Sequence, residues 1–201
     1  MTAIITGDIA NSRKLKTKAW LDRLKDLLAT KGDNPHDWEI YRGDQFQLEI
    51  GNPEDVLLTA LEIKAALKAV GVDLRMSIGI GDTQHRAAKI SESNGTAYIR
   101  SGETFEMLKK LKTNLAINTG NTAFDRELNL MLQLAMTIAD GWLAQSAEYV
   151  VTAIGNPNLS QEELGQKLGI NQAAVSRRHK RAQFDLMMDV DAYFRDKIKT
   201  L

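Results

Sequence analysis

Apolar residues in the first 122 positions follow two different spacings. The strand-like runs lie at 3–6, 38–42, 46–50, 74–81 and 114–122. The helix-like segments, in which apolar positions are three and four residues apart, lie at 18–29, 53–71 and 101–111. Their order predicts an α+β sandwich in which the helices lie on one face of a mainly antiparallel sheet.

Only helical spacing continues beyond this point. The pattern predicts helices within 125–145, 149–154, 160–168, 171–182 and 183–201. Because strand-like runs stop near Thr122, we expect two domains, an α+β domain at 1–122 and a helical domain at 123–201.

Residues 160–182 have the pattern of a helix-turn-helix. Ser160 and Glu163 are spaced as a capping box, and Gly169 is suited to end the first helix in a left-handed conformation. Asn171 is suited to cap the second helix, and Gly165 allows the two helices to approach closely. The apolar positions that would pack the pair are Leu164, Leu168, Ile170 and Val175.

The second helix of this pair predicts DNA binding. Its expected exposed face and flanks carry Asn171, Gln172, Ala173, Ser176, Arg177, Arg178, Lys180 and Arg181. Asparagine, glutamine and arginine are the side chains that read base edges, and flanking cations suit phosphates. The whole chain has no net charge, with 26 basic and 26 acidic residues, so this basic excess is local. A solvated charged face on a helical hairpin is the alternative interpretation.

The stretch from about 142 to 182 resembles helix-turn-helix domains of bacterial regulators, including modules like region four of sigma factors. The resemblance implies double-stranded DNA as a partner. His179 stands where such sequences usually have leucine, and we expect it to be partly buried against the first helix of the pair.

Composition places few other limits on function. The chain has 43% hydrophobic residues and no cysteine, which excludes disulfides and thiolate metal sites. It contains no apolar segment long enough to cross a membrane and no signal-peptide pattern at its start. A cytoplasmic location is therefore expected.

Two aspartates in the first domain suggest an oxygen-ligand site. Asp8 follows the first strand and Asp44 lies on the 42–45 hairpin, so both carboxylates are expected at one edge of the sheet. Together with the Ile9 carbonyl they would suit Mg²⁺, which also binds phosphate oxygens. The residues after Asp8 that would contact a nucleotide phosphate are Asn11, Ser12 and Arg13. The alternative is that both aspartates only stabilise turns.

These segments resemble a known family. The stretches Gly-Asp-Ile at 7–9, Gly-Asp-Gln-Phe-Gln at 43–47 and Gly-Ile-Gly at 79–81 are similar to the SatD family and, more distantly, to class III and GGDEF-type nucleotide cyclases. The resemblance implies a cyclase-like, ferredoxin-like first domain, with Asp8 and Asp44 as metal ligands. Ile40, Ile99 and Glu103 occupy positions where cyclases place their purine-reading and phosphate-binding side chains. The sequence therefore assigns no catalytic residue.

Two functions follow as expectations. The first is a DNA-binding transcriptional regulator whose first domain binds a metal or nucleotide or mediates dimerisation. The alternative is a metal-dependent enzyme that acts on nucleoside triphosphates, and a protein-interaction scaffold is a weaker third possibility. A homodimer is also expected, because 183–201 carries an apolar stripe of Phe184, Met187, Val190, Phe194, Ile198 and Leu201. Packing of this stripe onto 125–145 of the same chain is the competing interpretation.

Overall fold

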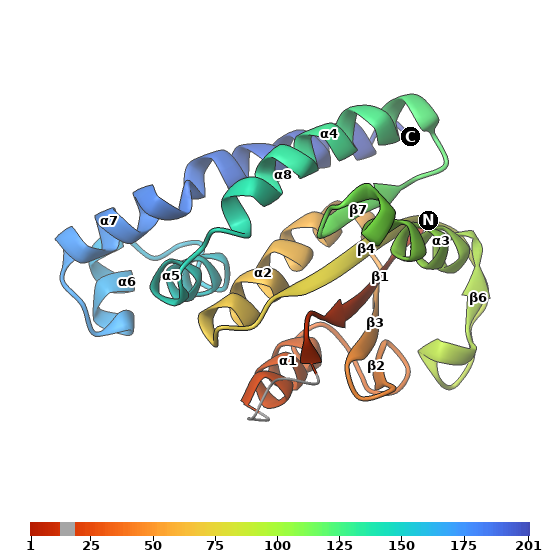
Figure 1. The fold of residues 1–201 in the computed structure, drawn as a ribbon, viewed down its shortest axis with the longest axis horizontal. Helices are drawn as coiled ribbons and strands as arrows, with labels where there is room; N and C mark the ends of the chain where they lie inside the picture. Colours follow the sequence, from red (N-terminus) through yellow and green to blue (C-terminus); the bar gives the residue numbers. More distant parts are fainter. Residues whose placement is uncertain (13–18) are drawn as a thin grey trace.

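The computed structural model describes residues 1–12 and 19–201 of the chain (Figure 1). The strands are β1 (Thr2–Ile9), β2 (Trp38–Tyr41), β3 (Gln45–Ile50), β4 (Leu74–Gly81), β5 (Thr83–His85), β6 (Asn94–Gly95) and β7 (Leu115–Asn118). The α-helices are α1 (Ala19–Ala29), α2 (Val56–Ala69), α3 (Thr96–Leu111), α4 (Thr122–Ala139), α5 (Ala144–Ile154), α6 (Gln161–Leu168), α7 (Gln172–Ala182) and α8 (Phe184–Ile198). The 3₁₀ turns are η2 (Pro53–Asp55) and η3 (Ile90–Glu92). The architecture is α+β, as the sequence predicts.

A five-stranded sheet organises the first part of the chain. Its strand order is β2-β3-β1-β4-β7, and each neighbouring pair is antiparallel except β4 and β7. In the register of the central strands, Asp8 of β1 lies opposite Gln45 of β3 on one side and Arg75 of β4 on the other. This register brings the end of β1 next to the hairpin that carries Asp44.

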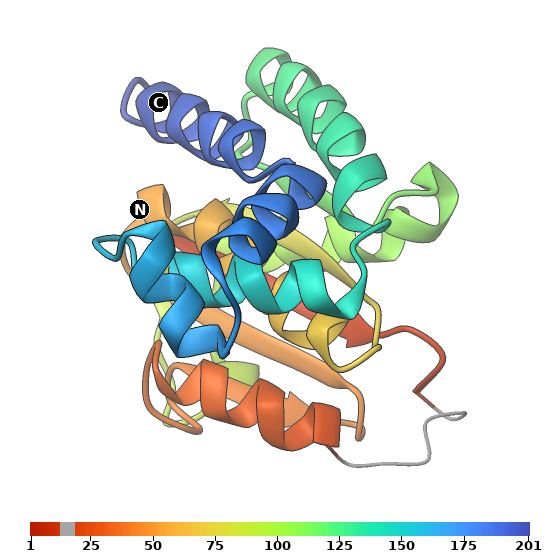
Figure 2. The ribbon, with the colours of Figure 1, turned by 90° about the vertical axis from the view of Figure 1, so that its left-hand side faces the viewer.

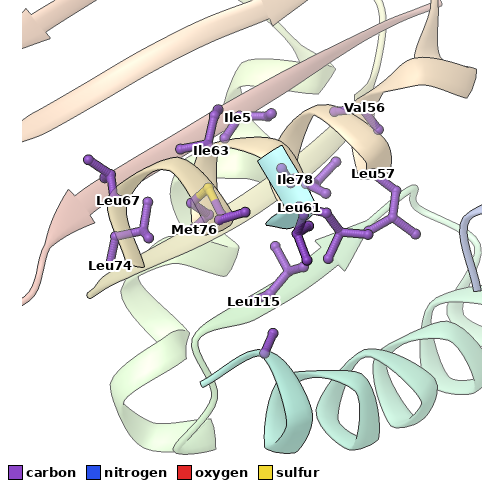
Figure 3. Packing of buried hydrophobic residues seen from close by; sticks show 14 of the residues in the cluster. Ile5, Val56, Leu57, Leu61, Ile63, Leu67, Leu74, Met76, Ile78 and Leu115 are labelled. Carbon is purple, nitrogen blue, oxygen red and sulfur yellow. The ribbon is translucent and has the colours of Figure 1, made fainter. Parts of the chain in front are cut away.

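One face of the sheet is apolar and forms the main core. Alternate residues of β1 and β4, such as Ile5, Met76 and Ile78, point to this face and are completely buried. Leu57, Leu61 and other side chains of α2 pack on them (Figure 3), and α1 lies against α2. The core continues into α4, α5 and α8, so the helical second half shares it.

The opposite face of the sheet is partly polar and is covered by α3. Ser77 and Ser101 are buried there, and the Ser101 hydroxyl donates to Thr6 Oγ1 at 2.7 Å. A Cβ at Gly79 would lie 2.1 Å from the Ala97 carbonyl oxygen, so only glycine permits this approach of helix to strand. The prediction that all helices lie on one face is therefore wrong, because α1 and α2 cover one face and α3 the other.

Several element boundaries also differ from the sequence-based prediction. Helix α3 begins at Thr96 rather than at Ser101, and the short β5–β6 hairpin before it was not predicted. The expected helix over 125–145 ends at Ala139, and a turn leads into α5. These differences arise because short and polar segments carry little periodic signal. No helix in the part of the chain that the structure describes is long and apolar enough to span a membrane.

A buried lysine connects the sheet to the helical half. Lys64 of α2 is only 1% exposed, and its Nζ lies 2.5 Å from Oδ1 of Asp73, which precedes β4, and 2.5 Å from Oδ1 of Asp140, which ends α4. The Asn114 side-chain amide donates to Asp140 Oδ2 at 2.8 Å. One ammonium group thus links three segments of the chain.

The apolar stripe on the last helix packs within its own chain. Met187, Phe194 and Ile198 are buried, and α8 contacts α2 and α4. Arg195 fixes this position, since its guanidinium lies 2.6 Å from Asp191 Oδ2 and 2.6 Å from Asp55 Oδ1 at the start of α2. These buried members of the stripe are therefore unavailable to a second subunit, and the competing interpretation of the stripe is correct.

Candidate functional site

Helices α6 and α7 are joined by a three-residue turn whose ends are capped as predicted. The Ser160 hydroxyl accepts a hydrogen bond from the Glu163 N–H at 3.3 Å, and the Glu163 carboxylate accepts from the Ser160 N–H at 2.7 Å. Gly169 is left-handed, with φ of 65°. The Asn171 side chain accepts from the Ala174 N–H at 2.9 Å. These bonds set where each helix begins and ends.

Close contact at Gly165 sets how the two helices meet. A Cβ on Gly165 would lie 2.8 Å from the Ile170 carbonyl oxygen and 3.3 Å from a methyl group of Val175. Val175 is fully buried, and Leu164 is buried beside it. Helix α5 packs against both α6 and α7, which gives a unit of three helices (Figure 2) at the left-hand end of the molecule in Figure 1.

The side chains predicted to contact DNA lie mainly on the outer face of α7. Those that the structure leaves exposed are Asn171, Gln172, Ala173, Ser176, Arg177, Lys180 and Arg181, while Arg178 is half-buried. None of the four cations makes an ion pair with any of the residues at 1–12 or 19–201. Helix α7 contains no acidic residue. This face is thus positively charged and open to solvent.

His179 is partly buried, but its neighbours differ from the prediction. Its ring packs against Tyr149 of α5 and Phe184 of α8, rather than against α6. Nδ1 lies 2.8 Å from the Tyr149 hydroxyl and Nε2 lies 2.8 Å from Asp185 Oδ2. Burial, with a smaller contribution from the Asp185 charge, raises the pKa of Tyr149 to about 12. The phenol therefore stays protonated at neutral pH and can donate to His179, which holds α7 on α5.

A second polar site lies at the end of β1. A depression of about 460 Å³ is lined by both aspartates and by two cations, and its residues are Asp8, Ile9, Ala10, Asn11, Ser12, Asp44, Arg75 and Lys109. The Ser12 hydroxyl donates to Asp44 Oδ2 at 2.5 Å, and the Ile9 N–H donates to the Asp44 carbonyl at 3.0 Å. The structure therefore brings the predicted metal and phosphate residues together, apart from Arg13, which lies outside the described residues.

Arg75 changes the chemistry expected of Asp8. Its guanidinium donates to both carboxylate oxygens of Asp8, with Nε 3.0 Å from Oδ1, and stacks over the Phe105 ring at 5.9 Å. A metal at this position would compete with that ion pair. The described part of the chain holds no cluster of three or more histidine, cysteine or acidic side chains that would bind a metal. Asp44 Oδ2 already accepts the Ser12 hydroxyl, and Asp8 could bind a cation only after release from Arg75.

Sequence reasoning missed the roles of Arg75 and Lys109. Arg75 follows from strand pairing, since it lies directly opposite Asp8 in the register of β1 and β4. Lys109 comes from the last turn of α3, where it had no motif to mark it. The positions compared with cyclases do not line this depression, since Ile99 and Glu103 point to solvent on α3 and Ile40 lies in β2.

Comparisons with known proteins give a family. A family model described as the SatD family matches residues 2–199. Neither the curated proteins nor the solved structures that were compared with the chain include a significant match. Because the family model covers nearly the whole chain, this protein belongs to the SatD family.

Proposed function

We propose that this protein is a DNA-binding transcriptional regulator in which α5, α6 and α7 form a helix-turn-helix and α7 is the recognition helix. The observation that carries the proposal is the exposed outer face of α7, with its amide side chains, its cations and no acidic residue. Gln172 and Ser176 lie near the N-terminal end of α7, where a recognition helix contacts base edges in the major groove. The cap and the Gly165 contact hold this helix at a fixed angle to α6.

Contacts to bases and contacts to phosphates require different positions, so the cations of α7 are expected to have different roles. Arg177 shares the exposed face with Gln172 and Ser176, which suits a base contact to guanine. Arg178 is half-buried and Arg181 lies at the end of the helix, so both suit phosphate contacts. With these two phosphate contacts, binding should weaken by about 10-fold between 50 and 200 mM salt, because counterions that are released from the DNA on binding must be released into a higher salt concentration.

The first test is Arg177→Ala. We expect it to weaken binding to a specific site by about 1–3 kcal/mol and to relax the preference at one base pair, because one bidentate base contact is lost. Selection of binding sites from random duplexes, followed by fluorescence anisotropy at several salt concentrations, measures both effects. Lys110→Ala, which removes an exposed cation from α3, is the matched control. Unchanged binding by the Arg177 variant, or salt-independent binding by the parent, would contradict the assignment.

A second candidate function is nucleotide binding in the first domain, assisted by Mg²⁺. The observation in its favour is that Asp44, Ser12, Arg75 and Lys109 line one depression and combine oxygen ligands with cations suited to phosphates. The sheet order β2-β3-β1-β4, with helices after β1 and β3, is also that of a ferredoxin-like motif and is consistent with a cyclase-like domain. A bound nucleotide would make this domain the sensor of the regulator.

The expected result for this site is a small thermal stabilisation by Mg²⁺ alone and a larger one by Mg²⁺ with a nucleoside triphosphate. Arg75→Gln should increase the response to Mg²⁺ alone, because it frees the Asp8 carboxylate from its ion pair. Differential scanning fluorimetry and titration calorimetry measure both responses. If an Asp8→Asn/Asp44→Asn double variant responds like the parent, the two aspartates are structural.

A separate experiment tests the alternative that the protein is an enzyme acting on nucleoside triphosphates. Incubation with each nucleoside triphosphate and Mg²⁺ or Mn²⁺, followed by chromatography, would reveal a cyclic or linked product. We expect none. A product that disappears in Asp44→Ala would make the enzyme function the better one.

A further inference from the structure

The C-terminal end of α7 is held by a tryptophan from the turn between α4 and α5. Trp142 is buried in this turn, and its Nε1–H donates to the backbone carbonyl of Ala182 at 3.0 Å. Ala182 is the last residue of α7 and is completely buried. The last four carbonyls of an α-helix lack partners within the helix, and a buried carbonyl without a partner is costly. The indole therefore satisfies a group that α7 by itself leaves unpaired.

The same turn is fixed to the part of the chain that forms the sheet. Asp140, the first residue after α4, has Oδ1 2.5 Å from Lys64 Nζ, and its Oδ2 accepts from the Asn114 amide at 2.8 Å. Its backbone carbonyl accepts from Lys68 Nζ at 2.6 Å. Both lysines belong to α2, and Asn114 directly precedes β7. Three oxygens of one residue are thus bonded to the α+β half of the molecule.

Between Asp140 and Trp142 the backbone has little freedom to move. The chain passes from α4 through this turn into α5 (Figure 1), and three successive N–H groups of the turn bond back to carbonyls of α4. They belong to residues 140, 141 and 142, with donor–acceptor distances of 2.9, 3.0 and 3.2 Å. A displacement of Asp140 therefore displaces Trp142 and, through the indole, the end of α7.

We infer that Trp142 is a positioning residue for α7, and that the α4–α5 turn makes the position of α7 depend on the Lys64 cluster, which consists of Lys64, Asp73 and Asp140. The inference deepens the proposed function, because the α+β half of the chain would then control DNA binding through the placement of the recognition helix. That consequence rests on DNA binding, whereas the positioning of α7 does not.

The first test compares two tryptophans that make the same bond. Trp142→Phe keeps a buried ring but removes the donor to Ala182. Trp38→Phe is the matched control, because Trp38 is also buried and its Nε1–H donates to the Gly32 carbonyl, again at 3.0 Å. Amide hydrogen exchange of the full chain without DNA should show protection in α7 reduced about 10-fold by Trp142→Phe, the factor for one buried hydrogen bond, and unchanged by Trp38→Phe.

Protection of the α2 amides in the same samples shows that both variants remain folded. No loss in α7 with Trp142→Phe would overturn the inference. An equal loss with Trp38→Phe would also overturn it, because α7 would then open only together with the whole fold.

The second test examines the role of the Lys64 cluster with two matched carboxylates. Asp140→Asn and Asp73→Asn each weaken one ion pair of the same ammonium, and each carboxylate lies 2.5 Å from Lys64 Nζ and is about a third exposed. We expect Asp140→Asn to reduce protection in α7 by about 5-fold, the upper end for a partly exposed ion pair. Asp73→Asn should leave it unchanged, since Asp73 lies outside the α4–α5 turn.

Combining Asp140→Asn with Trp142→Phe tests whether both act through one contact. The double variant should lose no more protection in α7 than Trp142→Phe alone, because the indole bond is already absent. Losses that multiply would mean that the cluster and the tryptophan act independently, which would overturn the inference. Equal effects of Asp140→Asn and Asp73→Asn would overturn it as well.

DNA affinity measures the functional consequence separately. Trp142→Phe should weaken binding to a selected duplex by up to about 10-fold, because α7 must then be ordered at the expense of binding, and Trp38→Phe should not. Unchanged affinity in both variants would contradict the control of DNA binding by the α+β half. A parent that binds no DNA but shows the expected exchange pattern would count against the proposed function alone, and the positioning of α7 would stand.

Discussion

Phe194→Ala is expected to destabilise the protein by about 3–5 kcal/mol, the range for deleting a buried aromatic ring from a packed core. Phe194 is completely buried, and the surrounding helices α2 and α4 are held by other contacts, so they cannot close the resulting cavity fully. Chemical denaturation monitored by circular dichroism measures the loss as a lower midpoint at an unchanged slope.

Leu186→Ala is the matched control, since Leu186 lies on the same helix and is 48% exposed. It should change the free energy of unfolding by less than about 0.5 kcal/mol. Equal effects of the two substitutions would contradict the assignment of Phe194 to the core of its own chain.

Lys64→Met is expected to cost about 3 kcal/mol, at the low end of the range for removing one partner of a buried ion pair. The ammonium is 1% exposed, and its removal takes the ion-pair partner from the Asp140 carboxylate and leaves Asp73 with Lys68, whose Nζ lies 3.5 Å from Asp73 Oδ2. The side chains of Asp73 and Asp140 are each about a third exposed to solvent, which reduces the free-energy cost of removing the lysine. Thermal and chemical unfolding of the variant and the parent measure the difference.

A triple variant distinguishes the effect of the Lys64 charge from the effect of the packing of its alkyl chain. Lys64→Met with Asp73→Asn and Asp140→Asn should recover most of the lost stability, because no unpaired carboxylate remains. If the triple variant is as unstable as Lys64→Met, the lysine acts through packing of its alkyl chain instead.

The same cluster predicts a pH dependence. Burial opposes ionisation of Asp73, but the charge and hydrogen bond of Lys64 and the Leu74 N–H outweigh it, so the pKa of Asp73 lies below its usual value. A carboxyl group with a lowered pKa stabilises the fold above its unfolded pKa of about 3.9, and this contribution is lost as pH falls through the folded pKa. The stability difference between parent and Lys64→Met should therefore narrow below about pH 4. A constant difference down to acidic pH would contradict the ionic role of Lys64.

The sequence predicted the helix pair at 160–182 closely because its signals are local. A capping box needs only Ser160 and Glu163 three residues apart, and a left-handed helix end needs only Gly169. Strands 74–81 and 46–50 were predicted for a similar reason, since alternation at period two is visible in a single strand. Whether α7 binds DNA stays a prediction, because exposure and charge define a surface but not its partner.

The polar site at the end of β1 was predicted only in part. Asp44 lies on a turn that the sequence marks and Asp8 lies near the end of β1, and the pairing of β1 with β3 places both at one depression. The ion pair of Asp8 with Arg75 depends on the register of two strands that are 67 residues apart in sequence, and no local pattern encodes a register.

By itself the sequence determined the α+β class, the local caps of α6 and α7 and the cationic character of α7, because each depends on residues within a few positions of one another. Only the tertiary structure decided that α3 covers the second face of the sheet, that Lys64 joins Asp73 to Asp140, and that the stripe containing Phe194 faces inward. An apolar stripe predicts that a helix face will be buried but not by what, since burial in the same chain and burial in a dimer have the same pattern. The contacts of α8 with α2 and α4 made this choice, because they bury Met187, Phe194 and Ile198 within the same chain.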